Sequence, residues 1–403
     1  MKICGIISEF NPFTNGHEYI IHQVKAKYGL NCLCLTSGNF MQRGEMAVED
    51  KYARSACAIK SGADIVVEMP LAFSLSSAEY FAFGSIKILK DLDISHLAFG
   101  VKIEDTSVLE NFAKIKANEP EMVKTYIKNF LKAGLDYNKA LKSSYEIAFP
   151  ELKKDIDIIF SEPNNILALE YLCAIIKLKA NIKPIFIQRL DGGYNNAKSI
   201  KSDNKHFLSA TAIRNMIQKG KIKRIKKYVP SDSFILLKNI KEQILKSSKD
   251  RLDTLLISNI RNLSYLKLEQ INDYNNSLTH LILDNCKMYS CTDDIINACN
   301  TKNFKESRIR RLLLLPYFDI TKLKFKKILH DNLPINVLAV SKSKKVLLSH
   351  LIKTSKRKLI VSLKDKESLS EDERLIIDIA QKSSNLYDTC NQRPYKEDKT
   401  IFI

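Results

Sequence analysis

Short apolar runs alternate with longer segments of helical periodicity along the first 200 positions of the chain. Runs with the length and composition of buried strands lie at Ile3–Ser8, Cys32–Thr36, Asp64–Glu68, His96–Phe99, Asp157–Phe160 and Pro184–Gln188. Helical periodicity covers Gly16–Lys27, Ala47–Lys60, Ser77–Lys90 and Ile166–Lys179. Because short β-rich runs separated by helices form βα crossovers, this pattern predicts an α/β fold with a doubly wound parallel sheet. Ligands of such sheets bind at the carboxyl ends of the strands, near the point where the strand order reverses.

Two departures from this alternation suggest a domain organisation. Residues 104–152 are polar and helical, which predicts a helical insertion in the sheet domain. From about Ser231 the chain is mainly helical to Tyr317, and a mixed tail follows with possible strands at Ile335–Val340 and Leu359–Ser362. We therefore expect an α/β domain over residues 1–230, with its insertion at about 104–152, and a mainly helical C-terminal domain over residues 231–403.

Charge adds a constraint on the partners. The chain has 64 Lys and Arg residues against 45 Asp and Glu residues, which gives a formal net charge of +19. Such an excess favours polyanionic partners, with nucleic acid ahead of a membrane surface. A Lys-rich composition throughout the chain is the alternative explanation. The segment Lys219–Lys227 concentrates six cations and no acid, so its residues Lys223, Arg224, Lys226 and Lys227 are candidate contacts to RNA.

Cysteines, histidines and apolar runs narrow the class further. The nine cysteines form no CxxC pair and several lie in apolar runs, as reduced intracellular cysteines do. The seven histidines do not cluster with them at ligand spacing, so no protein-bound metal is expected. No apolar run reaches the ~18 residues that cross a bilayer, and Glu9 interrupts the first one. These features predict a cytoplasmic protein without a membrane segment, and nothing indicates an obligate protein partner.

The strongest chemical signal follows the first predicted strand. Glu9–His17 reads EFNPFTNGH and leads directly into a predicted helix. Gly16 allows a ligand to approach the backbone, and a helix N-terminus offers unpaired N–H groups and partial positive charge. Phosphate suits such a place, and His17 and Thr14 would reach the same oxygens. A capped turn with a surface histidine is the structural alternative, but the strand before and the helix after favour the phosphate site.

The T-x-G-H string at this position resembles the nucleotidyltransferase superfamily, whose members act on the α-phosphate of ATP. The longer string resembles the bacterial tRNA(Met) cytidine acetate ligases, which usually have His where this chain has Thr14. Further strings similar to that family are Ser37–Glu45, Gly62–Asp64, Glu68–Pro70, Ser77–Phe81, Phe99–Gly100, Pro163–Leu167, Arg189 with Gly193–Tyr194, Ser209–Arg214 and Ser307–Arg311.

The resemblance implies an ATP-dependent ligase. It would activate acetate as acetyl-adenylate, release pyrophosphate and pass the acetyl group to the exocyclic amine of the wobble cytidine of elongator tRNA(Met). ATP would be the nucleotide and Mg²⁺ its companion, while acetate and elongator tRNA(Met) would be the other substrates. Two alternatives stay open at this stage: a small-molecule adenylyltransferase of a coenzyme pathway, and a non-catalytic RNA-binding protein with a nucleotide-binding fold.

The resemblance also implies particular site residues. The catalytic candidates are His17, Thr14 and Arg43, the last of which could hold acetate or a phosphate. The ATP-binding candidates are Ile7, Ser8, Glu9, Phe10, Asn11, Pro12, Phe13, Thr14, Asn15, Gly16, His17, Glu18, Tyr19, Ile20, Gly100, Asn164, Asn165 and Arg189. One of the two asparagines is expected to cap the helix that starts at Ile166. Thr211 and Arg214 are expected to open a helix that closes over the phosphates.

Two further cations are ambiguous. Lys51 and Arg54 lie three positions apart on a predicted helix, so they would share one face. They could face phosphate, and a solvated helix face is an equal alternative. Glu68 and Glu79 could orient them, although a structural role for these two acids is favoured.

Overall fold

The computed structural model of the chain describes residues 1–190, 200–202, 205–240, 242–300, 304–394 and 398–403. Its centre is a sheet with the strand order β10-β8-β3-β2-β1-β4-β5. Five strands run parallel: β1 (Ile3–Ser8), β2 (Asn31–Ser37), β3 (Ile65–Met69), β4 (His96–Val101) and β5 (Lys183–Gln188). The predicted parallel α/β sheet is thus confirmed. The strand order reverses between β1 and β4, which marks the crevice where ligands of such sheets bind.

Three short strands from the C-terminal part extend the same sheet beyond β3. β8 (Ile335–Val340) is antiparallel to β3, whereas β9 (Leu359–Ile360) and β10 (Ile401–Phe402) are parallel to β8. Every residue of β8 is buried. The domain boundary after residue 230 stays a prediction, although strands from both sides of it share one sheet.

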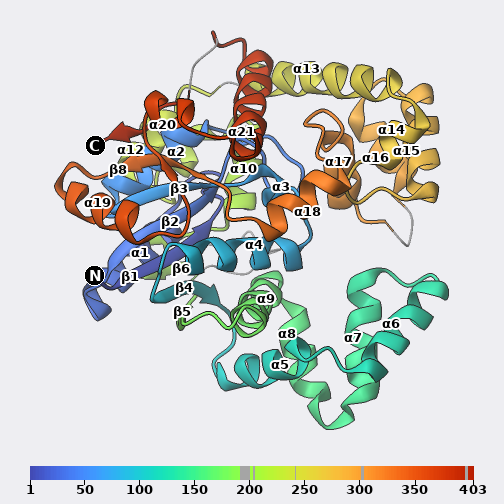
Figure 1. Ribbon diagram of the computed structural model, residues 1–403, viewed down its shortest axis with the longest axis horizontal. Helices are drawn as coiled ribbons and strands as arrows, with labels where there is room; N and C mark the ends of the chain where they lie inside the picture. The colour runs from blue at the N-terminus through green and yellow to red at the C-terminus, as the bar shows by residue number, and fades with distance from the viewer. Residues whose placement is uncertain (191–199, 203–204, 241, 301–303, 395–397) are drawn as a thin grey trace.

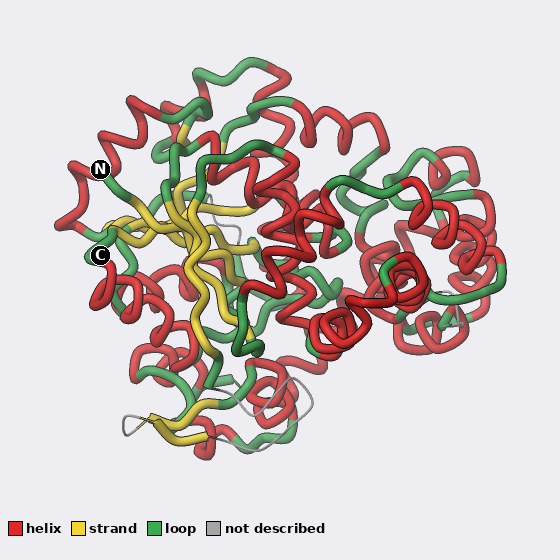
Figure 2. Tube along the Cα trace, turned by 90° about the horizontal axis from the view of Figure 1, so that it is seen from below, coloured by secondary structure: helices red, strands yellow, loops and turns green. Residues whose placement is uncertain are grey.

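Helices cover both faces of the sheet (Figures 1 and 2). Side chains alternate between the faces along a strand, and β2 shows how the sequence uses this. Cys32 and Cys34 join the core under α1 (Asn15–Tyr28) and α2 (Lys51–Lys60), whereas Leu33 and Leu35 join the core on the other side. That second face is covered by α3 (Leu71–Ser74), α4 (Ala78–Asp91) and α9 (Pro163–Lys177).

The helical excursion between β4 and β5 begins where the sequence predicts it. Before α9 it contains α5 (Ser107–Ala117), α6 (Glu121–Lys132), α7 (Tyr137–Ala148), η1 (Pro150–Leu152) and α8 (Lys153–Ser161). The predicted strand Asp157–Phe160 is wrong, because these residues lie in α8. Ile156 and Ile159, three positions apart, are buried on one side of that helix. A short apolar run cannot by itself distinguish a strand from one face of a helix.

The remaining elements follow β5. A hairpin of β6 (Ile200–Ser202) and β7 (Lys205–Phe207) precedes a predominantly helical region. Its helices are α10 (Ala210–Gln218), α11 (Ile222–Ile225), α12 (Ser231–Leu237), α13 (Glu242–Arg261), α14 (Tyr265–Glu269), α15 (Asn276–Met288), α16 (Thr292–Cys299), α17 (Glu306–Leu314), α18 (Lys322–His330), η2 (Lys342–Lys344), α19 (Lys345–Thr354), α20 (Leu363–Glu367) and α21 (Glu371–Cys390). Among the residues described, no helix is both long enough and apolar enough to span a bilayer. The cytoplasmic location itself stays a prediction.

Candidate nucleotide-binding site

The loop from Glu9 to Thr14 joins β1 to α1 and is tightly held. Phe10 and Phe13 are each 1% exposed, and their ring centroids lie 5.0 Å apart. Phe10 has a φ of +49°, and the Asn11–Pro12 peptide bond is cis. The Asn11 side chain is buried, and its Oδ1 accepts a hydrogen bond of 2.9 Å from the amide of Val48. The loop is therefore fixed before any ligand arrives.

His17 is oriented by the residue that caps its helix. The Thr14 amide donates to His17 Nδ1 at 3.0 Å, and the Thr14 hydroxyl lies 3.2 Å from the same nitrogen. The rings of Phe10 and Phe13 pack against the imidazole at centroid distances of 5.1 and 5.6 Å. Since Nδ1 accepts the amide hydrogen, the ring proton is assigned to Nε2, which becomes the donor. Thr14 thus positions His17, and a direct phosphate contact by its hydroxyl stays a prediction.

Gly16 leaves open the space that a phosphate would take. A Cβ built at Gly16 would meet only Thr14 Oγ1, at 3.5 Å, so the fold itself does not demand glycine there. The Nδ2 atom of Asn11 is a second sign, because it is buried with no hydrogen-bond partner among the described residues. A buried donor of this kind is rare in a folded protein. Open space and an unsatisfied donor beside a helix N-terminus both fit a bound nucleotide.

Several side chains in the predicted ATP-binding run point elsewhere. Asn15 is buried, and its Nδ2 donates at 2.9 Å to the carbonyls of both His206 and Lys227. Its amide donates at 3.0 Å to the carbonyl of Tyr228. Further along α1, Glu18 at the end of the first turn pairs with Lys205, Tyr19 packs on Phe207, and Ile20 joins the core beneath the helix. The first turn of α1 therefore anchors residues 205–228.

A second group of predicted residues meets at the ends of β4 and β5. Arg189 Nη1 donates to Asn164 Oδ1 at 3.3 Å. The Arg189 side chain crosses Gly100, where an added Cβ would lie 2.8 Å from Arg189 Cγ. Asn165 has no exposed surface, and its Oδ1 accepts from the Lys102 amide at 2.9 Å, which ties α9 to the end of β4; its contact to ATP stays a prediction. The expected asparagine cap is wrong, because Glu162 is the N-cap of α9.

The loop after β2 carries Arg43 at its tip. Phe40 and Met46 form an antiparallel bridge at its base, and Arg43 is exposed between them. Gly44 has a φ of +73°, and a Cβ there would lie 2.6 Å from Arg310. This loop therefore packs directly against α17 of the C-terminal part. The catalytic role of Arg43 stays a prediction.

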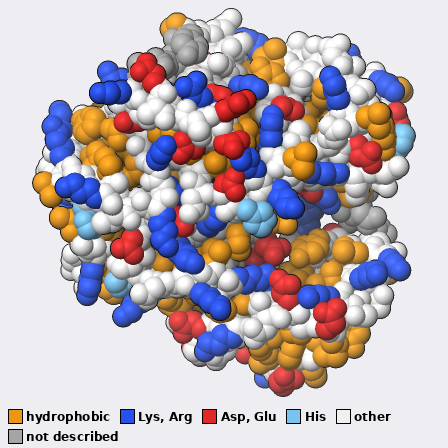
Figure 3. Space-filling view, viewed as in Figure 1, with side chains coloured by type: hydrophobic (Ala, Val, Ile, Leu, Met, Phe, Trp, Pro, Cys, Tyr) orange, Lys and Arg blue, Asp and Glu red, His pale blue; other side chains and the backbone are white. Residues whose placement is uncertain are grey.

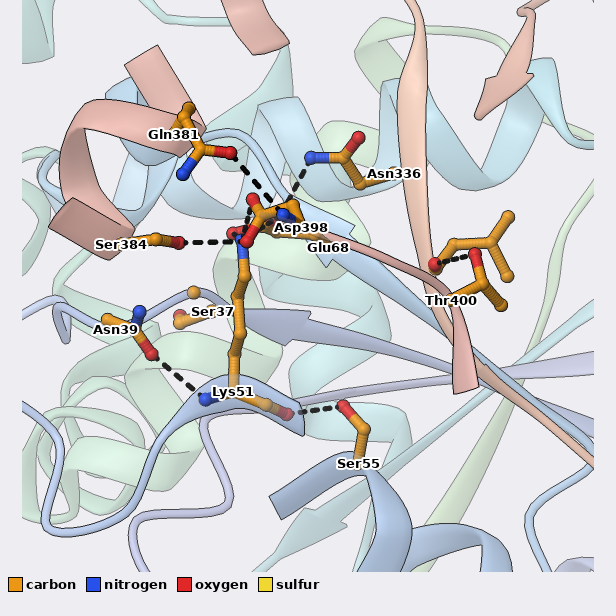
Figure 4. Close-up of polar contacts among 12 residues, drawn as sticks. Ser37, Asn39, Lys51, Ser55, Glu68, Asn336, Gln381, Ser384, Asp398 and Thr400 are labelled. Atoms are coloured by element: carbon orange, nitrogen blue, oxygen red, sulfur yellow. Dashed lines mark hydrogen bonds and ion pairs between the residues drawn. The ribbon is translucent and has the colours of Figure 1, made fainter. Parts of the chain in front are cut away.

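Neither Lys51 nor Arg54 faces a ligand or solvent. Each is 1% exposed. Lys51 Nζ pairs with Glu68 at 2.9 Å and with Asp398 at 2.6 Å, and Asn336 donates to the same glutamate (Figure 4). Both open alternatives for this lysine are thus replaced by a buried network, and the structural role of Glu68 is confirmed.

Arg54 plays the matching part at the ends of the central strands. It donates to the carbonyls of Glu9, Ser37, Gly38 and Glu49. Glu9 follows β1, Ser37 and Gly38 mark the end of β2, and Glu49 comes shortly before α2, so one guanidinium fixes the loops after both strands. No pattern in the sequence distinguishes this arginine from a surface one.

Arg214 was expected to approach the phosphates from α10, and it reaches the motif itself. Its Nη1 donates at 2.8 Å to the carbonyl of Asn11, and its Nη2 lies 3.5 Å from Glu45. Ser209 caps α10 by accepting from the amide of Ala212. Gly193 and Tyr194, which carry part of the family resemblance, lie outside the described residues.

The basic segment Lys219–Lys227 lies beside this site. All six of its Lys and Arg side chains are exposed. All six, together with Asn215 and Tyr228, line an open groove of about 970 Å³ between α10 and α11. Elsewhere on the surface, cations are scattered among acids, as Figure 3 shows for one face. The net charge alone would therefore not locate a binding surface, and RNA contact by this segment stays a prediction.

A histidine donor over an open helix N-terminus, at the switch point of a parallel sheet, defines a nucleotidyltransferase site. Consistent with this, the chain matches the family described as HIGH Nucleotidyl Transferase over residues 1–400 and belongs to it. Crystal structures of Thermotoga maritima TmcAL, one apo and one bound with alpha-thio ATP, are similar over the full length of both chains. Their TM-scores are 0.88 and 0.86, each at 25% identity.

Within that class the sequence relatives are more specific. A tRNA(Met) cytidine acetate ligase of Clostridium perfringens (strain ATCC 13124) is 33% identical, with 97% of this chain and 96% of the relative covered. That of Halothermothrix orenii is 31% identical, with 98% and 94% covered. The chain belongs to the tRNA(Met) cytidine acetate ligase family, and the resemblance read from its motifs is confirmed.

Proposed function

We propose that this ligase joins acetate to AMP, using ATP, and then acetylates the exocyclic amine of the wobble cytidine in elongator tRNA(Met). The family membership and the relatives' names support this reaction, and the T. maritima protein bound with alpha-thio ATP supports the nucleotide. One observation carries the proposal for this chain. Asn15, in the first turn of the phosphate-binding helix, holds the basic segment through the carbonyl of Lys227. Nucleotide site and polyanion surface are therefore one assembly.

The first step takes place at the N-terminus of α1. Acetate attacks the α-phosphorus, and the bond to pyrophosphate breaks, so negative charge grows on the equatorial and leaving oxygens. The His17 Nε2–H group, the amides of α1 and Arg189 stabilise this charge without needing to rearrange. Mg²⁺ would be held by the phosphate oxygens and would offset their charge. Among the described residues, no three or more His, Cys, Asp or Glu side chains are grouped to hold a metal ion.

The adenosine end has its own contacts. Gly100 lets the Arg189 side chain cross the backbone of β4, and Asn164 and Arg189 are already joined there, beside the proposed position of the nucleoside. Arg43, at the tip of the loop after β2, is the proposed acetate contact. The guanidinium of an arginine can hold a carboxylate through two parallel hydrogen bonds.

The second step brings the RNA to the same edge of the sheet. The wobble base lies in a single-stranded loop, so exposing it costs little unstacking energy. Lys223, Arg224, Lys226 and Lys227 would contact backbone phosphates in the groove between α10 and α11. Such contacts set the register of the RNA, and base recognition requires other groups.

The proposal is tested by two assays on purified protein. With Mg²⁺ and ATP, labelled pyrophosphate should exchange into ATP only when acetate is present. With elongator tRNA(Met) added, nucleoside analysis should then detect acetylated cytidine. Exchange supported by nicotinamide mononucleotide or phosphopantetheine instead of acetate would indicate the small-molecule adenylyltransferase. RNA binding without any exchange would indicate the non-catalytic alternative.

A further inference from the structure

A cavity of about 390 Å³ lies between the loop after β2 and the C-terminal helices. Its lining comes mainly from that loop and from α10, α13, α16 and α17. Cavities of about 300–1,000 Å³ with mostly apolar walls and a few polar groups typically hold small ligands. Apart from Arg214, none of the lining residues has a role in the proposed reaction, so the cavity is a candidate site of its own.

The cavity shares a wall with the phosphate loop. Arg214 and Val48 both line it. Arg214 Nη1 donates at 2.8 Å to the carbonyl of Asn11, and the Val48 amide donates at 2.9 Å to the Asn11 side chain. Two lining residues are thus hydrogen-bonded to the loop between β1 and α1. A ligand in the cavity would therefore lie beside the loop where the proposed acetyl-adenylate forms.

Helix α10 separates this cavity from the basic groove. Asn215 and Lys219, one turn apart, line the groove. Arg214 and Gln218, also one turn apart, line the cavity. Because successive residues of a helix point about 100° apart, the groove and the cavity lie along neighbouring faces of α10. An RNA strand whose phosphates lie in the groove can therefore place a splayed base in the cavity by crossing a single helix.

Three charged side chains meet on the cavity wall. Glu45 lies between two arginines, because Arg310 Nη1 donates to its Oε1 at 3.0 Å and Arg214 Nη2 lies 3.5 Å from its Oε2. These contacts use two of the roughly four acceptor positions of a carboxylate. Each arginine has five N–H groups, so donors remain as well. The two arginines fix Glu45 in place and leave hydrogen-bonding capacity for a ligand.

Much of the remaining lining is apolar. Leu252 and Leu256 of α13 and Ile296 of α16 are each at most 8% exposed. The Lys249 ammonium in the lining pairs with Asp293 at 2.7 Å, so it does not need a ligand as its counter-ion. A small anion would gain nothing from such walls, whereas a pyrimidine ring would bury its faces against them.

We propose that this cavity binds the splayed wobble cytosine of the tRNA and that Glu45 reads its exocyclic amine. The inference rests on the proposed function and adds the site of base recognition to it. Glu45 accepts a hydrogen bond from the N4 amine, as carboxylates do from cytosine, and Arg214 and Arg310 donate to the ring acceptors N3 and O2. Recognition of a splayed base through its pairing edge is typical of proteins that read single-stranded RNA loops.

This arrangement also explains how uridine is rejected. Uracil has a carbonyl oxygen at the position of the amine, so an acceptor would face the Glu45 carboxylate. Its N3 carries a hydrogen, which would face the arginine donors. Both groups of the site would be left with the wrong partner. Because Arg214 also bonds the phosphate loop, the same contacts hold the amine on the side of the cavity that adjoins the acetyl-adenylate.

The decisive variant fills the cavity without removing a charge. Leu245→Trp introduces a large ring at a half-buried lining position of α13. Ile244→Trp, at the neighbouring exposed position outside the lining, is the matched control. Binding is compared, at one salt concentration, between elongator tRNA(Met) and the same tRNA with uridine at the wobble position.

We expect the wild-type protein and Ile244→Trp to bind the cytidine form about 5- to 150-fold more tightly, the range for one well-matched base contact. Leu245→Trp should lose this preference and most acetyl transfer, measured in a single turnover from preformed acetyl-adenylate. Its acetate-dependent pyrophosphate exchange should stay near wild type.

Glu45→Gln separates recognition of the amine from the shape of the cavity. Glutamine keeps the size of the side chain, and its amide can donate to the uracil oxygen. The variant should therefore bind the uridine form more tightly than the wild-type protein does, a gain that loss of a merely structural residue would not produce. Glu306→Gln, which removes the other partner of Arg310 and lies outside the lining, should leave the preference unchanged.

Three results would overturn the proposal. They are equal binding of both tRNAs by the wild-type protein, an intact preference in Leu245→Trp, and an equal loss of preference in both tryptophan variants, which would assign the effect to α13 as a whole. Failure of the proposed function would look different. Absence of acetate-dependent exchange with a retained preference for cytidine would contradict the adenylation step and still support the base site.

Discussion

The start of α2 and the segment beside α1 contain the same kind of side chain in opposite environments. Lys51 and Arg54 are buried, and carboxylates and carbonyls of the protein satisfy them. The cations of Lys219–Lys227 are exposed, and the segment is held to α1 through the Lys227 carbonyl, which accepts from Asn15. The first group acts on the fold, whereas the second is available to a partner. The net charge of +19 therefore combines buried and exposed cations that composition cannot separate.

The largest expected effect tests the buried cations at the start of α2. Lys51→Met leaves Glu68 and Asp398 buried without their counter-ion, and breaking such a pair typically costs about 3–5 kcal/mol. Urea unfolding followed by circular dichroism should show a loss of this size in the free energy of unfolding. Lys60→Met, on the same helix but in an exposed pair with Asp232, should change it by less than about 1 kcal/mol. Equal effects of the two variants would erase the distinction.

The second-largest expected effect tests the exposed cations of Lys219–Lys227. If about four of its cations contact phosphates, the affinity for tRNA should fall about two orders of magnitude between ~50 and ~200 mM salt. Replacing Lys223, Arg224, Lys226 and Lys227 with Gln should flatten this dependence and impair acetyl transfer. The free energy of unfolding and acetate-dependent exchange should stay near wild type. An unchanged salt slope, measured by filter binding, would return the segment to a merely solvated surface.

A smaller expected effect distinguishes His17, the proposed hydrogen-bond donor to phosphate, from Thr14, which orients it. Hydrogen bonds to charged groups are worth about 1.5–3 kcal/mol, against ~1 kcal/mol for ordinary ones. His17→Ala should therefore slow pyrophosphate exchange by tens of fold. Thr14→Ala should slow it less, because the Thr14 amide still holds Nδ1. Wild-type exchange in both variants would mean that this loop does not bind the phosphates.

The smallest expected effect concerns the carboxyl group of Glu49, whose backbone carbonyl accepts a hydrogen bond from the buried Arg54. Burial raises the pKa of Glu49 to about 7, so the folded state retains a proton there that the unfolded chain has already lost. Stability from this group is therefore complete at acid pH and declines as pH rises from about 5 to about 7.5. Glu49→Gln should reduce that decline by on the order of 1 kcal/mol, measured as unfolding free energy at both pH values. The same decline in both proteins would assign it to other groups.

Much of the sheet could be predicted from the sequence, because strands buried on both faces leave uninterrupted apolar runs. The strands Ile3–Ser8 and Ile335–Val340 match the structure in full. The run at Asp157–Phe160 looked the same and is helical, since its two buried isoleucines fit one helix face. Local composition did not contain the information that distinguishes them.

The site was predictable where its chemistry is contiguous. Thr14, Gly16 and His17 lie within four positions, and the geometry around them follows from a strand and a helix. The buried network around Lys51 was not predictable, because Lys51 pairs with Asp398, which lies 347 positions away in the sequence. Likewise, Gln42 gives no sign in the sequence that its backbone joins Arg311 to Glu9. Contacts made by the backbone do not constrain which side chain the residue carries, so they produce no recognisable pattern in the sequence.

The late arrival of β8, β10 and Asp398 has a consequence for synthesis on the ribosome. At about 5–20 residues per second, Asp398 is added about 20 to 70 s after Lys51. Until residues 335–340 emerge, β3 is an open edge of an apolar parallel sheet, and such edges can pair with other chains. During this time Lys51 and Glu68 lack Asp398, the third member of their buried network. Residues 1–230 are thus synthesised long before β8 can cover the edge at β3. A chain stalled before residue 335 would leave this edge exposed to chaperones or proteases.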